Sequence, residues 1–95
     1  MTEGKMRRLD NIVRRDIHGE VLLVPIRGRS AEMQRLFVLN EVGDFIWRRL
    51  DGTHSRDDIL RLLQDRYIVR AQDAASDLEE FLGLLSAANL VEEVP

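Results

Sequence analysis

The sequence contains no cysteine, and this absence excludes disulfide bonds, thiol catalysis and metal sites built on thiolates. No apolar run approaches the roughly 20 residues that a membrane-spanning helix needs. The first ten residues are polar and basic, and they lack the apolar segment of a secretory signal. We therefore expect a cytoplasmic protein with no membrane partner.

The residue types that usually carry catalysis are few and scattered. The only histidines, His18 and His54, lie far apart in the sequence, and neither has a second histidine or a carboxylate at the spacing of metal ligands. The serines lack the glycine-flanked elbow of hydrolases, and the glycines form no phosphate-binding cluster. Adjacent acids such as Asp57 and Asp58 diverge by about 100° on a helix and make no catalytic pair. We expect no enzyme activity, no metal and no cofactor.

The chain does have enough apolar sequence for one folded unit. It is 95 residues long, 44% hydrophobic and 33% charged, which is typical of a globular protein and too apolar for a disordered one. A chain this short supports a single core. We expect one domain over residues 11–95, preceded by a flexible segment over residues 1–10.

The first half of this domain has the pattern of a small antiparallel sheet. Two β-branched runs, Asn11–Ile17 and Glu20–Ile26, flank the turn pair His18-Gly19 and predict a hairpin. Arg27–Met33 shows no periodicity and predicts a loop. Gln34–Leu39 then predicts a third strand.

This third predicted strand is apolar on both faces. Leu36 and Val38 share one face, whereas Phe37 and Leu39 share the other. Such a strand is either covered on both faces or leaves one face for a partner. Periodicity alone does not tell which of the two faces packs in the core.

Three helices should follow the sheet, because helix caps and helical spacing alternate over the rest of the chain. Asn40 and Ser55 are suitable N-caps, and Ser55 with Asp58 resembles a capping box. The third helix has an apolar arc that covers almost half of its circumference, wider than docking on one neighbour requires. The predicted helices run from Asn40 to about Leu50, from Ser55 to about Tyr67, and from about Ala71–Asp73 to about Ala88. The fold class is therefore α+β, a winged helix-turn-helix-like domain of a three-stranded antiparallel sheet and three helices.

A winged helix usually suggests nucleic acid, but the charge pattern argues against a specific reader. Residues 1–50 contain ten Lys and Arg against seven acids, whereas residues 51–95 contain four Arg against ten acids. The third helix exposes only acids and neutral residues, where a recognition helix needs basic ones. A nucleic-acid-binding or transcriptional regulatory domain remains the alternative, through contacts of the basic first half. A better candidate is a peptide that adds to the edge of the third strand.

The same residues resemble the PqqD family of precursor-peptide-binding domains, also called RiPP recognition elements. The resemblance runs from about Ile12 to Val91, and the order and spacing of its short motifs make it specific. The family usually has glycine at the position of Asn89, and asparagine tolerates the same conformation. The matching residues are Leu36-Phe37-Val38-Leu39-Asn40, Gly43, Phe45-Ile46-Trp47, Leu50-Asp51-Gly52, Ile59, Leu63, Tyr67, Asp77-Leu78, Phe81-Leu82, Leu85 and Asn89-Leu90-Val91.

The resemblance implies a non-catalytic adaptor that binds the leader of a ribosomally made precursor peptide beside the third strand and against the third helix. It also implies presentation of that peptide to a modifying enzyme, a radical SAM protein in the pyrroloquinoline quinone (PQQ) pathway or another peptide-modifying enzyme. Trp47 matches an aromatic position that we expect in the core. The implied peptide-binding residues are Arg35, Leu36, Phe37, Val38 and Leu39 on the strand, and Ala74, Ala75, Asp77, Leu78 and Leu82 on the helix.

Overall fold

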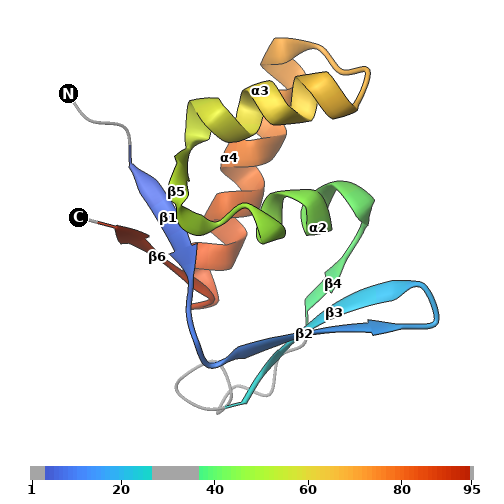
Figure 1. The fold of residues 1–95 in the computed structure, drawn as a ribbon, viewed down its shortest axis with the longest axis vertical. Helices are drawn as coiled ribbons and strands as arrows, with labels where there is room; N and C mark the ends of the chain where they lie inside the picture. The colour runs from blue at the N-terminus through green and yellow to red at the C-terminus, as the bar shows by residue number, and fades with distance from the viewer. Residues whose placement is uncertain (1–3, 27–36, 95) are drawn as a thin grey trace.

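The computed structural model describes residues 4–26 and 37–94, which form two three-stranded sheets and three helices (Figure 1). This arrangement confirms the α+β class. All strand pairs are antiparallel. In chain order the elements are β1 (Lys5–Arg8), β2 (Ile12–Ile17), β3 (Glu20–Pro25), β4 (Phe37–Leu39), α2 (Glu41–Arg48), β5 (Asp51–Ser55), α3 (Arg56–Arg66), α4 (Ala71–Ala87) and β6 (Val91–Val94).

The predicted hairpin is confirmed as β2 and β3. His18 and Gly19 both have positive φ angles, 53° and 83°, as a tight turn between twisted strands requires. Val21 lies opposite Asp16 on one side of β3 and opposite Leu39 on the other, so β4 completes a sheet of order β2-β3-β4. The predicted loop Arg27–Met33 and the first residues of the third predicted strand lie outside the described residues.

A second sheet, β5-β1-β6, differs from the sequence-based expectation. Residues 1–10 were expected to be flexible, but Lys5–Arg8 form its central strand and pair on both sides. The polar Asp51–Ser55 segment, expected to end one helix and begin the next, also forms a strand. These strands were missed because pairing with distant segments overrides weak local propensity. The sheet brings the two ends of the described chain together (Figure 1).

The predicted helix caps are confirmed. The Asn40 side chain accepts a hydrogen bond of 2.7 Å from the Gly43 amide at the start of α2. Ser55 and Asp58 form a reciprocal capping box at the start of α3. After α4 the chain passes through Asn89 with a φ of 61°, the left-handed conformation that ends a helix and that asparagine tolerates.

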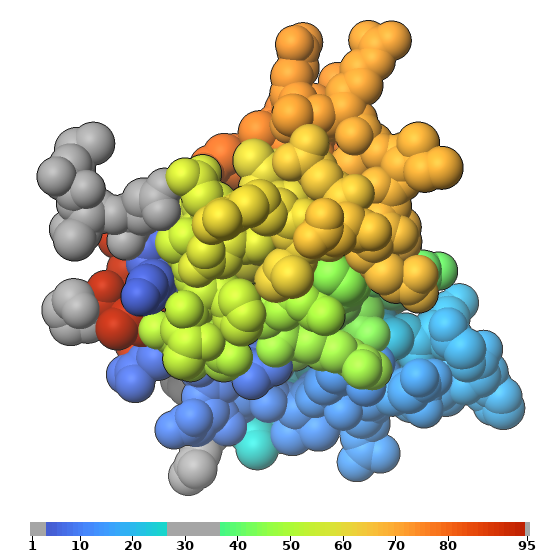
Figure 2. Space-filling view, turned by 45° about the horizontal axis from the view of Figure 1, so that its top comes forward, coloured from blue at the N-terminus to red at the C-terminus, as the bar shows by residue number. Residues whose placement is uncertain are grey.

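One core lies between the helices and both sheets. Trp47 on α2 belongs to it, as expected. On the face shown in Figure 2, the residues of α3 (yellow) lie beside those of α2 (green), and the β2–β3 hairpin (blue) projects to one side. The largest side chains with essentially no exposure come from β3, the segment between α2 and β5, helices α3 and α4, and the turn before β6; in chain order they are Leu23, Leu50, Ile59, Leu85 and Leu90.

A charged clamp holds the hairpin against α2. Arg14 on β2 donates two hydrogen bonds to the Asp44 carboxylate, of 2.6 and 2.7 Å, and Arg48 approaches the same carboxylate at 3.2 Å. These bonds from Arg14 hold the pKa of Asp44 below its usual value and raise the pKa of Arg14. The clamp fixes the sheet β2-β3-β4 relative to the helix that follows β4.

Candidate functional site

Strand β4 is an edge strand in the part of the chain that the structure describes. It pairs with β3 through one edge, and no described strand lies along its other edge. An open edge presents unpaired N–H and C=O groups that can accept a further strand. The edge is short, and helix α2 begins directly after it.

The structure decides which face of β4 is core. Leu39 is 5% exposed and Phe37 packs partly buried against the same core, whereas Val38 on the opposite face is 64% exposed. The first two predicted site residues, Arg35 and Leu36, lie outside the described residues. Among the three described strand residues predicted to bind peptide, Val38 alone has a largely exposed side chain. The other two strand residues bring their backbone to the edge.

Helix α4 uses several of the predicted contact residues for packing. Leu78 and Leu82 are each 2% exposed and belong to the core, and Ala74 is also buried. A side chain with so little exposed surface cannot contact a peptide directly while the domain stays folded. The centre of the wide apolar arc of α4 therefore faces the core.

One flank of the buried stripe of α4 lies next to the start of α2, the helix that directly follows β4. At 100° per residue, Asp77, Phe81 and Leu84 fall together on one side of the buried stripe. Phe81 lies under the start of α2, because a Cβ atom at Gly43 would be 3.5 Å from the Phe81 ring. Leu84 is 54% exposed and Asp77 is exposed. We call Asp77, Phe81 and Leu84 the β4-side flank of α4.

Phe81 and Leu84 were not among the site residues predicted from the sequence. Both contributed to the apolar arc, but nothing in the sequence told which edge of the arc turns towards the third strand. The contact between Phe81 and the backbone of Gly43 supplies that information. A Cβ atom at this position would make an ordinary contact with the ring, and its tightest neighbour would be the Asn40 side-chain oxygen at 3.3 Å.

Ala75, the remaining predicted helix residue, lies on the opposite flank. It lines a cavity of about 270 Å³ together with Leu60 of α3 and Gly4. Arg56 closes this region, with its Nε 3.0 Å from a carboxylate oxygen of Glu79. Ala75 and the β4-side flank therefore do not belong to one surface.

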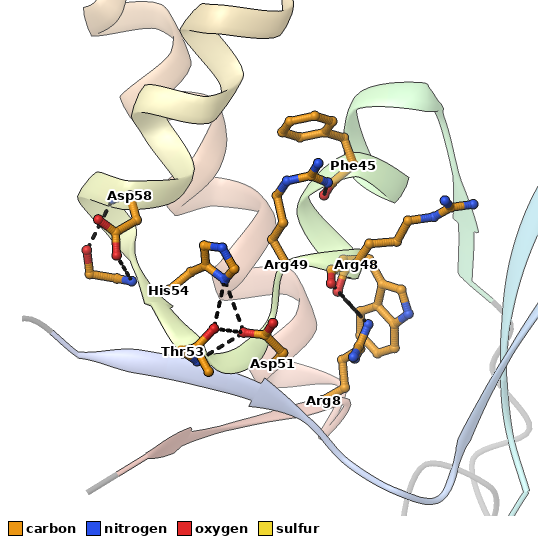
Figure 3. A network of polar contacts seen from close by, with 10 residues as sticks. Arg8, Phe45, Arg48, Arg49, Asp51, Thr53, His54 and Asp58 are labelled. Carbon is orange, nitrogen blue, oxygen red and sulfur yellow. Dashed lines mark hydrogen bonds and ion pairs between the residues drawn. The ribbon is translucent and has the colours of Figure 1, made fainter.

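A histidine and a carboxylate, His54 and Asp51, contact each other on β5, and the sequence analysis did not predict this contact. His54 Nδ1 lies 3.1 Å from a carboxylate oxygen of Asp51, which also accepts hydrogen bonds from the Thr53 hydroxyl and amide (Figure 3). The hydroxyl bond is the main reason that the pKa of Asp51 lies well below its usual value. The cluster orders the strand before the capping box of α3. Among the described residues, no three His, Asp or Glu side chains gather as metal ligands.

Two arginines of the first half, Arg8 and Arg49, contact other groups of the described protein. Arg8 donates to the carbonyl oxygens of Trp47 and Arg48 at the end of α2, at 3.3 Å each. Arg49 lies 3.5 Å above the centre of the Phe45 ring and donates to the Phe45 carbonyl (Figure 3). Such arginines stabilise the helix terminus and the aromatic ring.

No helix in the described part of the chain combines the length and the apolar composition of a membrane span.

Comparisons with known proteins agree on one family. The model of the family described as Coenzyme PQQ synthesis protein D (PqqD) matches residues 20–91. The structure titled "TbiB1 in Complex with the TbiA(beta) Leader Peptide" is 27% identical, with a TM-score of 0.74, over 90% of this chain and 94% of that chain. "Lasso peptide synthetase B1 complexed with the leader peptide" is 22% identical, with a TM-score of 0.75, over 96% and 99%. No curated protein sequence matches the chain.

Proposed function

Because its residues 20–91 match the family model, the chain belongs to the PqqD family, and we propose that it is a non-catalytic adaptor for a ribosomally made precursor peptide. It binds the leader of that precursor in the cytoplasm and presents it to a modifying enzyme, of the radical SAM class or another peptide-modifying class. The observation that carries the proposal is the edge of β4 that no described strand covers, together with Phe81 of α4 next to the start of α2, which directly follows β4. The similar TbiB1 structure contains a leader peptide, which supports the same role here.

The proposed site combines backbone and side-chain recognition. The leader adds as a strand along Arg35–Leu39, and its inward side chains contact the β4-side flank of α4, where Phe81 and Leu84 supply the apolar surface. Leu78 and Leu82 support this surface from the core. Backbone hydrogen bonds provide affinity in strand addition, and the side-chain contacts provide specificity.

An NMR titration tests the location of binding. The probe is the leader half of a short precursor encoded beside the gene, added to the ¹⁵N-labelled full chain. We expect shifts concentrated in residues 37–40 and 77–84. Saturating shifts confined to the β2–β3 hairpin or to α3 would contradict the proposed site, even with tight binding.

A second experiment tests strand addition itself without altering the protein. The leader is synthesised with a single N-methyl group at each successive position. An added antiparallel strand directs the N–H groups of alternate residues to its partner, so affinity should fall at every second position. Equal effects at all positions, or no effect, would contradict strand addition. The variant Val38→Pro is a complementary test, with circular dichroism to establish that the edge strand tolerates the change.

A further inference from the structure

Some exposed carboxylates around α4 have a partner, whereas Asp77, and Glu80 about 60° further round the helix, have none in the described structure. Glu79, on the flank away from β4, pairs with Arg56, and Glu92 on β6 pairs with Arg7. Asp77 on the β4-side flank has no hydrogen bond or ion pair in the described structure. Asp73 lies in the first turn of α4, where a carboxylate stabilises the helix dipole. Asp77 lies beyond that turn, so interaction with the helix dipole does not explain its position.

Asp77 is also isolated from basic residues of its own segment. The sequence has no Lys, Arg or His from residue 71 to its end. The nearest apolar side chains on the same flank are those of Phe81 and Leu84, one and two helical turns further on. Along this flank, from the N-terminal to the C-terminal end of α4, an unpaired negative charge is therefore followed by an apolar surface.

The direction of an added strand follows from the arrangement of β4 and α4. Strand β4 runs towards α2, and α4 runs the opposite way, towards β6 (Figure 1). All described strand pairs are antiparallel. A leader that adds antiparallel to β4 therefore runs in the same direction as α4. Its earlier residues meet the level of Asp77, and its later residues meet Phe81 and Leu84.

The spacing within the leader follows from the geometry of helices and strands. Asp77 and Phe81 are separated by four residues, or about 6 Å along a helix at 1.5 Å per residue. Two residues of a strand span about 6.6 Å and place both side chains on one face. We propose that the site selects a leader in which a Lys or Arg is followed, two residues later, by a large apolar residue. This inference rests on the proposed function and assigns Asp77 the role of a specificity-determining residue.

The test uses random peptides, so that the residue preference of the site is measured independently of any one leader. A displayed library of random 12-residue peptides is selected against the immobilised full chain and against Asp77→Asn. Asp65→Asn is the matched control, since Asp65 is an exposed, unpaired carboxylate on α3 that loses the same charge. We expect enrichment of the basic-x-apolar pattern with the wild type and the control, and loss of the basic preference with Asp77→Asn.

A double-mutant cycle then measures the coupling between the two charges. One selected peptide and its Lys→Gln form are titrated into the wild type and Asp77→Asn. An exposed ion pair predicts a coupling of about two- to fivefold in affinity at low salt, reduced at 0.5 M salt by screening.

Three outcomes separate this inference from the proposed function. Selected peptides that shift β4 resonances without a basic preference would overturn the inference and leave the adaptor role intact. A basic preference that survives Asp77→Asn would also overturn it. If no selected peptide shifts β4 resonances, the proposed function and the inference both fail.

Discussion

Two adjacent leucines on α4 should respond to the same substitution in opposite ways. Leu84 is 54% exposed on the β4-side flank, whereas Leu85 is fully buried in the core. Leu84→Ala should therefore weaken peptide binding and leave the fold intact. Leu85→Ala should destabilise the fold.

The expected magnitudes follow from the exposed surface of each side chain. Complete burial of a leucine contributes about 1.5–3 kcal/mol. Leu84 has about half of its surface left to bury, so its loss should cost binding about 0.8–1.6 kcal/mol, or about four- to fourteenfold in affinity. Leu85→Ala removes a buried side chain and should lower the free energy of unfolding by about 2–5 kcal/mol. In a domain of this size each kcal/mol lowers Tm by about 4–8 °C.

Two measurements check this prediction: thermal unfolding by circular dichroism, and leader affinity by isothermal titration calorimetry. Leu84→Ala should lower the free energy of unfolding by only about 0.7–1.4 kcal/mol, because about half of the side chain is already covered in the folded protein. The reasoning is refuted if both variants lose similar stability. It is also refuted if Leu84→Ala unfolds normally and binds a β4-shifting leader as tightly as the wild type.

Three further outcomes test other parts of the structure. The pKa of Asp44 is lowered in the folded state, so its contribution is present above the unfolded pKa of about 4 and is lost as the pH falls through the folded value. Acid should therefore destabilise Asp44→Asn less than the wild type in denaturant titrations, and equal acid sensitivity would speak against the clamp with Arg14. Asn89 has a positive φ, so Asn89→Ala should cost about 1 kcal/mol and Asn89→Gly little; the reverse order in thermal melts would contradict a left-handed residue there. Duplex DNA should bind weakly and without sequence preference, because α4 is acidic; a sub-micromolar, sequence-selective gel shift at physiological salt would contradict this.

The sequence by itself determined the elements whose signals are local. Asn40 and the Ser55–Asp58 box mark helix starts because their side chains bond the first free amides within three residues. The turn at His18-Gly19 and the end of α4 at Asn89 depend on the conformational range of one or two residues. Such signals act between close neighbours in the chain, so tertiary contacts are not needed to interpret them.

The tertiary structure decided what depends on distant partners. Lys5–Arg8 and Asp51–Ser55 are strands only because they lie beside each other, and their polar sequences have no strong preference of their own. The two faces of β4 were equivalent in the sequence until docking against the helices buried Phe37 and Leu39 and left Val38 outside. The same holds for α4, whose apolar arc is symmetrical in pattern. The contact of Phe81 with Gly43 of α2 decides which flank of α4 lies next to the segment that follows β4. The sequence pattern could not show this, because the packing of one helix against another depends on side chains far apart in the chain.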